Sequence, residues 1–183
     1  RQPQVCAHDH TVQPGPGVAL GFDSGEDIVK AKKHIKIKDL FTMGAGFDYD
    51  MNAPELIRAS EATGGACPTR KVMEYYAARP LCFEPGESWQ YSLCHDVLAA
   101  LVEVVSGVRF GEYVKKNIFD VASMKESTYS FPESRLGEIM AQYKHNPESL
   151  EYRFVGPKIQ SYKLGAEYES GGAGCTSTAN DYV

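Results

Sequence analysis

The sequence lacks an excess of positive charge. Its 19 lysines and arginines are outnumbered by 24 acidic residues, which gives a net charge of −5 at pH 7. A nucleic-acid-binding surface needs clustered positive charge. The one basic cluster, over residues 30–38, we interpret as a solvated edge of the fold. The charge balance therefore argues against a nucleic-acid partner.

The sequence also has no apolar run long enough to span a membrane and no signal-peptide pattern. Because it opens at Arg1 rather than at a methionine, it is compatible with either a cytoplasmic or an exported parent protein. It therefore predicts no membrane segment and does not indicate a compartment.

Paired cysteine spacings are absent as well. The five cysteines are scattered and form no Cys-x-x-Cys pair, so neither a disulfide framework nor a structural zinc site is indicated. We expect reduced, partly buried thiols. The stretch Cys6-Ala7-His8-Asp9-His10 looks like a metal cluster, but it has no partner cluster, and a surface loop is the favoured interpretation. We predict no metal and no organic cofactor.

What the sequence does contain is the composition of one globular domain. It has 183 residues, of which 43% are hydrophobic, enough to bury a sizeable core. Residues 1–34 are poorly patterned, and we expect an irregular N-terminal segment there. Residues 35–183 should form a mainly α-helical unit, with amphipathic or capped helices expected over 37–43, 52–62, 68–79, 93–107 and 110–120.

The pattern loosens between residues 127 and 170. Alternating residues over 127–131 and 151–155 predict short strands, and hence one or two hairpins or extended loops. Ser177 has the residue type of a helix N-cap, and 178–183 reads as the first turns of a helix. Since natural domains seldom stop there, we expect the chain to be a fragment of a longer protein.

The most informative stretch runs from residue 83 to residue 107. A Pro85-Gly86 turn leads to Tyr91, and Ser92 is the predicted N-cap of a helix with one apolar stripe. Asp96 lies in its first turn, where a negative charge suits the helix dipole, and Gly107 is a natural end. Tyr91 is therefore expected to be held rigidly just before a well-packed helix.

This stretch resembles the second motif region of the serine β-lactamase-like superfamily, close to class C β-lactamases, DD-peptidases and family VIII carboxylesterases. The resemblance rests on Phe-x-Pro-Gly, Trp-x-Tyr-Ser and Asp-Val-Leu-x-x-Leu-Val-Glu-Val-Val-Ser-Gly within residues 83–107. Two further segments agree in order and spacing, Ile-Lys-Asp-Leu-Phe-Thr-Met-Gly-Ala-Gly-Phe over 37–47 and the glycine-rich 171–182. Together they cover roughly residues 35–183.

The resemblance implies that Tyr91 matches the tyrosine that assists proton transfer beside a nucleophilic serine. Taken alone, Tyr91 is one of eleven tyrosines and would be interpreted as a packing residue. The candidates for residues that line the cleft or support Tyr91 are Ser92, Leu93, Asp96, Gly171 and Gly172. Leu93 stands where Tyr-x-Asn members of the family carry asparagine, which favours an esterase or a peptidase over a β-lactamase. His95 is interpreted as a surface residue.

Two parts of that machinery are missing from the sequence. No lysine has a serine three positions before it, and no Lys-Thr-Gly occurs. No Gly-x-Ser-x-Gly occurs either, which excludes an α/β-hydrolase nucleophile. A serine is inert at neutral pH without a neighbouring base, so we expect this chain alone to be inactive.

The prediction is therefore the helical lobe of a β-lactamase-like serine hydrolase, with the α/β lobe missing. The parent would cleave an ester or an amide (a β-lactam, a peptide or a carboxylester) through an acyl-enzyme. The alternative is a non-catalytic binding or scaffolding module derived from the same family. In either case the face left by the missing lobe should favour self-association.

Overall fold

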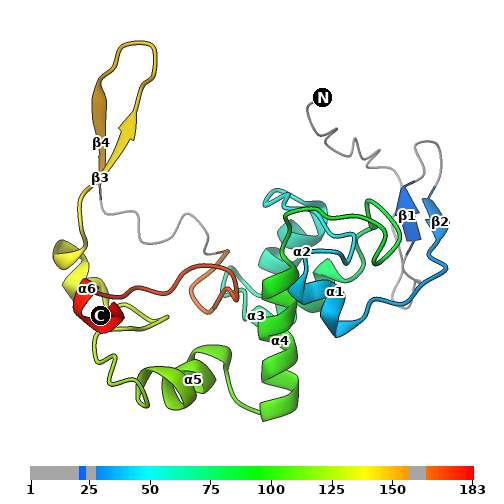
Figure 1. The fold of residues 1–183 in the computed structure, drawn as a ribbon, viewed down its shortest axis with the longest axis horizontal. Coiled ribbons are helices and arrows are strands. Elements are labelled where there is room, and N and C mark those ends of the chain that lie inside the picture. The colour runs from blue at the N-terminus through cyan, green and yellow to red at the C-terminus, as the bar shows by residue number, and fades with distance from the viewer. Residues whose placement is uncertain (1–20, 24–27, 157–163) are drawn as a thin grey trace.

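The computed structural model describes residues 21–23, 28–156 and 164–183, and the part that it describes is mainly helical, as predicted (Figure 1). The α-helices are α1 (Ile37–Phe41), α2 (Pro54–Ala62), α3 (Thr69–Tyr76), α4 (Cys94–Ser106), α5 (Phe110–Val114) and α6 (Ala179–Tyr182). A π-helical turn, Lys115–Phe119, continues α5, and a 3-10 helix spans Glu133–Glu138.

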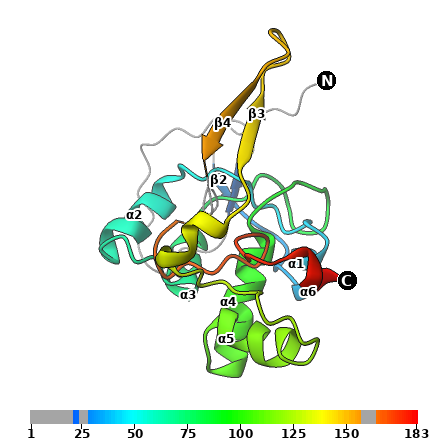
Figure 2. The ribbon, with the colours of Figure 1, turned by 90° about the vertical axis from the view of Figure 1, so that its left-hand side faces the viewer.

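The longest helix, α4, is the centre of the packing. It contacts α1, α3 and α5, and α2 packs on α3 (Figures 1 and 2). The core between these helices is built from fully buried apolar side chains such as Leu56, Val72, Tyr76, Leu81 and Leu93. Burying apolar surface in this way is the main favourable contribution to folding, so α4 and its neighbours form the rigid part of the fold.

The helix ends follow local chemistry in most places. Pro54 occupies the first turn of α2, and Gly64 and Gly65, both with positive φ, follow its end. Gly107 ends α4 in the left-handed conformation, as predicted.

Two predicted N-caps are wrong. The N-cap of α4 is Leu93 rather than Ser92, because the Ser92 hydroxyl lies against the sulfur atoms of Met43 and Cys94 instead. The N-cap of α6 is Thr178 rather than Ser177, and its side chain accepts a hydrogen bond from the backbone N–H of Asp181. The hydroxyl of Ser177 instead pairs with that of Ser127, at 2.7 Å.

Two antiparallel hairpins complete the described fold. Gly21–Asp23 (β1) pairs with Ile28–Lys30 (β2), within a region where we expected only an irregular segment. Gln142–His145 (β3) pairs with Tyr152–Gly156 (β4), which confirms a hairpin here, and it projects away from the helices in both views (Figures 1 and 2). The strand predicted over 127–131 is wrong, since this segment makes only an isolated bridge between Thr128 and Thr176.

The expectations about cysteines and membrane segments can be compared with the described residues. Cys67, Cys82, Cys94 and Cys175 are free thiols, of which Cys67 and Cys94 are buried. The Cys6–His10 stretch lies outside the described residues. Within the described ranges, no helix is long and apolar enough to cross a membrane.

Candidate active site

Tyr91 lies on a segment without regular secondary structure, two residues before the N-cap of α4, and the residue is 56% exposed. Its ring packs on the ring of Tyr49, with the two centroids 5.1 Å apart and the planes tilted by 44°. Tyr91 therefore presents a largely accessible phenol at the start of the most rigid helix.

The backbone on both sides of Tyr91 is tied to the loop that follows α1. The N–H of Gln90 donates to the carbonyl of Met43 at 3.1 Å, and the N–H of Leu93 donates to the carbonyl of Asp48 at 3.2 Å. Hydrogen bonds of this kind fix the position of a segment that belongs to neither helix nor sheet. The tyrosine is thus held by contacts that lie 45 or more residues away in the sequence.

The same loop runs close to the segment that precedes Tyr91. The carbonyls of Gly44 and Gly46 accept hydrogen bonds from the N–H groups of Gly86 and Cys82. At Gly46, φ is +92° and an added Cβ would lie 2.5 Å from the carbonyl oxygen of Phe83. Only glycine fits so close an approach with this backbone. Two of the three segments that carry the family resemblance therefore lie side by side.

The third segment, the glycine-rich stretch, packs on the first turns of α4. An added Cβ on Gly171 would lie 2.0 Å from the carbonyl oxygen of His95, so the chain passes directly over the helix. The Ser170 hydroxyl then accepts hydrogen bonds from the N–H groups of Gly172 and Ala173. All three segments thus meet around the N-terminal end of α4.

The candidate residues differ in how accessible they are. Leu93 and Ser92 are buried, and Leu93 belongs to the apolar core. Asp96 is buried too, and its carboxylate accepts a hydrogen bond of 2.6 Å from the hydroxyl of Tyr168. Gly172 is exposed and Gly171 half-buried. Among these candidates, Tyr91 alone offers an exposed functional side chain.

Burial governs the acid–base properties of the groups around α4. It raises the pKa of Asp96, and hydrogen bonds from Ser170 and Tyr168 to the carboxylate offset part of that effect. Burial, with the neighbouring charge of Asp96, also raises the pKa of Tyr168 far above its ordinary value. Burial likewise raises the pKa of the Cys94 thiol, so this cysteine has the environment of an inert packing residue.

A buried ion cluster that the sequence pattern did not indicate holds the loop between α1 and α2. The guanidinium of Arg79 lies within 2.9 Å of both carboxylate oxygens of Asp48 and 3.0 Å from the carboxylate of Glu55. Burial lowers the pKa of Arg79, but the hydrogen bonds and charges of the two carboxylates outweigh burial and raise it. The three residues are spread over 48–79, and no local spacing connects them. The only sign of the cluster in the sequence is that these charged residues stand among apolar neighbours.

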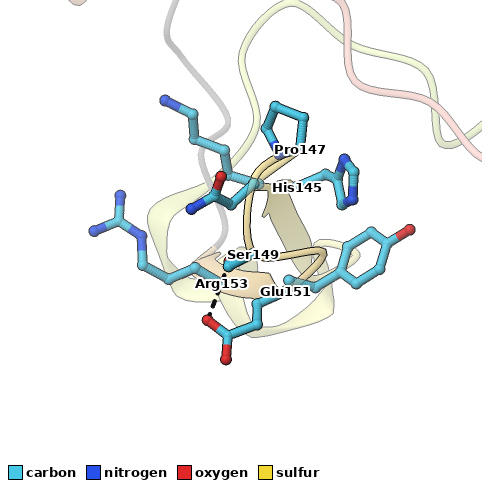
Figure 3. Close-up of a pocket in the computed structure, with 8 residues that line it drawn as sticks. His145, Pro147, Ser149, Glu151 and Arg153 are labelled. Carbon is cyan, nitrogen blue, oxygen red and sulfur yellow. Dashed lines mark hydrogen bonds between the residues drawn. The ribbon is translucent and has the colours of Figure 1, made fainter.

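A hollow in the described part of the chain lies away from Tyr91 in the sequence. It is formed at the tip of the β3–β4 hairpin by residues that include His145, Pro147, Ser149, Glu151 and Arg153 (Figure 3). These residues are exposed and come from a single hairpin, so the hollow does not have the enclosure of a typical ligand site. Among the described residues, no group of three or more His, Cys, Asp or Glu side chains is arranged to hold a metal ion.

Comparison with known proteins agrees with the sequence resemblance. Residues 16–183 match the family described as Beta-lactamase. The chain is 32% identical over 122 residues to a lovastatin esterase of Penicillium rubens, which covers 64% of this chain and 30% of that protein. It is 28% identical over 119 residues to a putative D-alanyl-D-alanine carboxypeptidase of Escherichia coli K12, which covers 63% of this chain and 26% of that protein.

Solved structures give the same fold. EstCE1, a hydrolase with promiscuous acyltransferase activity, matches with a TM-score of 0.64 at 22% identity, over 89% of this chain and 46% of that one. A mutant of the simvastatin synthase LovD from Aspergillus terreus matches with a TM-score of 0.62 at 24% identity, over 90% of this chain and 39% of that one. The chain therefore spans less than half the length of each of these relatives.

Proposed function

The chain belongs to the beta-lactamase family, and from this premise we propose that it is the helical lobe of a serine hydrolase that cleaves esters or amides through an acyl-enzyme. In this proposal the chain supplies the assisting Tyr91, and the nucleophilic serine and its lysine come from a part of the protein outside this sequence. The observation that carries the proposal is the placement of an exposed Tyr91 on a backbone tied on both sides.

The chemistry explains why such a placement is useful. A serine attacks a carbonyl carbon only when a positioned group accepts its proton, and the same proton must then reach the leaving group. A phenol held rigidly next to the serine can relay that proton without reorganising. Tyr91 has the required accessibility, because the residue is 56% exposed.

The neighbouring residues have supporting roles in this proposal. Ser92 and Leu93 anchor the segment of Tyr91 in the core. Asp96, Gly171 and Gly172 hold the glycine-rich stretch against α4. Because Leu93 provides no side-chain amide for an acylamino group, we favour a carboxylester or a peptide over a β-lactam as the substrate.

Exposed apolar residues on two of the segments that carry the family resemblance support the two-lobe arrangement. Phe41 and Trp89 are 66% and 65% exposed, which is unusual for such large side chains. We propose that the α/β lobe of the complete protein covers this side.

The test uses the complete protein that carries this chain and a p-nitrophenyl ester as substrate. Tyr91→Phe should lower kcat about 10²- to 10⁴-fold, the usual range for loss of a proton-transfer group. Tyr113→Phe, on α5, is the matched control and should retain the wild-type rate. The acyl-enzyme should appear as a mass increase equal to the acyl group. Equal rates for Tyr91→Phe and wild type would refute the role of Tyr91.

The second candidate is a non-catalytic binding or scaffolding module derived from the same family, and it would be favoured if the complete protein lacked Ser-x-x-Lys and Lys-Thr-Gly or His-x-Gly. The same experiment separates the two. A complete protein that forms no acyl adduct with the ester or with a fluorophosphonate probe would support the binding module.

A further inference from the structure

We propose that Tyr49 is a positioning residue for Tyr91. This inference rests on the proposed function, because it assumes that the phenol of Tyr91 takes part in the reaction. Tyr49 lies in the loop between α1 and α2 and is not one of the residues that the sequence motifs single out.

The contact between the two rings is the first support. Tyr91 is more than half exposed, and a solvent-exposed tyrosine samples several rotamers unless a neighbour restricts it. The ring of Tyr49, 5.1 Å away and tilted by 44°, covers one side of the Tyr91 ring. This tilted arrangement is within the favourable range for aromatic pairs. Tyr49 thus limits the directions in which the Tyr91 hydroxyl can point.

Tyr49 can do this because its own position is fixed. Its ring is half-buried and packs against the apolar core. The residues on either side of it, Asp48 and Asp50, both pair with the buried Arg79. The carbonyl of Asp48 also accepts a hydrogen bond of 2.8 Å from the hydroxyl of Tyr76, which is buried. The backbone beneath the Tyr49 ring is therefore anchored to α3.

The same carbonyl joins the two tyrosine segments. Besides Tyr76, it accepts the hydrogen bond from the N–H of Leu93, two residues after Tyr91. A shift of the Asp48 backbone would therefore move Tyr49 and the Tyr91 segment together. The ion cluster around Arg79 holds the pair in one arrangement before any substrate binds, which is the preorganisation that efficient proton transfer requires.

The experiment measures kcat and KM of the complete protein with the p-nitrophenyl ester. Tyr49→Phe keeps the ring and should stay within about twofold of wild type, while Tyr49→Ala should lower kcat about tenfold with little change in KM. In the Tyr91→Phe background, Tyr49→Ala should cause no further loss, because the residue it positions is already gone. Tyr75→Ala is the matched control, since Tyr75 is another half-buried tyrosine on the same core, and it should leave kcat unchanged.

The outcomes separate this inference from the proposed function. If Tyr91→Phe has no effect, the proposed function fails and Tyr49 has nothing to position. If Tyr91→Phe lowers kcat but Tyr49→Ala does not, or if the two losses multiply in the double variant, the role of Tyr49 is overturned alone. Should Tyr49→Ala fold poorly, Tyr49→Leu keeps an apolar side chain without the ring. Tyr49→Leu must then show the same tenfold loss, and wild-type kcat in that variant also overturns the inference.

Discussion

The hydroxyl of Tyr168 donates a hydrogen bond of 2.6 Å to the carboxylate of Asp96, and both residues are buried. The two residues lie 72 positions apart, so this bond fastens the glycine-rich stretch to the first turn of α4. Gly171, three residues after Tyr168, then passes over the carbonyl of His95. The bond therefore contributes to stability and also to the shape of the candidate site.

Removing that hydroxyl should destabilise the fold. Tyr168→Phe keeps the ring but leaves a buried carboxyl without one of its donors, which should lower the free energy of unfolding by about 1–3 kcal/mol. Urea unfolding followed by circular dichroism measures the loss. Tyr152→Phe, on the exposed hairpin, is the control. Equal effects of the two variants would contradict the importance of the bond.

Asp96 should make stability depend on pH in the direction opposite to that of most carboxylates. Burial raises its pKa above the ordinary value of 3.8. The folded state therefore binds the proton more tightly than the unfolded chain does. The contribution of the protonated carboxyl is fully present below pH 3.8 and is lost as the pH rises through the folded value. Asp96→Asn still accepts the Tyr168 hydrogen bond but does not titrate.

The measurement is the difference in unfolding free energy between wild type and Asp96→Asn across the acidic to neutral range. Wild type should lose stability relative to the variant as the pH rises. A difference that is constant, or that grows in favour of wild type, would show that the carboxylate is fully compensated by its hydrogen bonds.

The ion cluster around Arg79 should be costly to break. Arg79→Met removes the guanidinium that pairs with the buried carboxylates of Asp48 and Glu55, although Glu55 keeps its ion pair with Arg58. Loss of one partner of a buried pair costs about 3–5 kcal/mol. Arg135→Met is the control, because Arg135 forms its ion pairs on the surface and its loss should change stability little. A small effect of Arg79→Met in thermal unfolding would mean that solvent reaches the carboxylates.

Gly171 should tolerate no side chain. An alanine Cβ would lie 2.0 Å from the carbonyl oxygen of His95 and 3.1 Å from the Cβ of Ala99, so the glycine-rich stretch would have to move away from α4. Overpacking of this kind costs about 1–3 kcal/mol. Gly137→Ala provides the comparison, since nothing lies within 4 Å of its added Cβ. If both variants melt at the same temperature, the close approach is not maintained in solution.

Local sequence patterns predicted several helix ends, because residues at or next to those ends determine them. Both ends of α2 and the C-terminal end of α4 follow from Pro54, from the glycines after Ala62 and from Gly107, since these residues act on their own backbone. The apolar stripe predicted for α4 is right only near its start. Leu93 is buried and Val97 and Leu98 pack against the core, whereas Val105 is 79% exposed. The buried residues within the helix are Cys94, Asp96, Ala99 and Ala100, which are small or polar and so do not stand out in an apolar pattern.

Features that depend on residues distant in the sequence could not be predicted from local patterns. Ser92 has the residue type of an N-cap, but its hydroxyl lies against Met43, which is 49 positions away. Residues 127–131 alternate like a strand, yet their one bridge partner, Thr176, lies far along the chain. The ring of Tyr49 contacts Tyr91, and the guanidinium of Arg79 contacts Asp48, only through tertiary packing, so no motif spacing predicts these contacts.

The link between Thr69 and Glu169 has a consequence for a chain growing from the ribosome. The Thr69 hydroxyl donates to the carbonyl of Glu169 at 2.9 Å and accepts from its N–H at 2.7 Å, across 100 positions. Helices α2, α3 and α4 are synthesised well before residues 168 and 169, at a rate of about 5–20 residues each second. For several seconds, therefore, Thr69 has no Glu169 to bind and Asp96 has no Tyr168. During this time the core also lacks Tyr168, which is buried in the finished fold. Apolar surface left exposed in this way makes a nascent chain prone to aggregation.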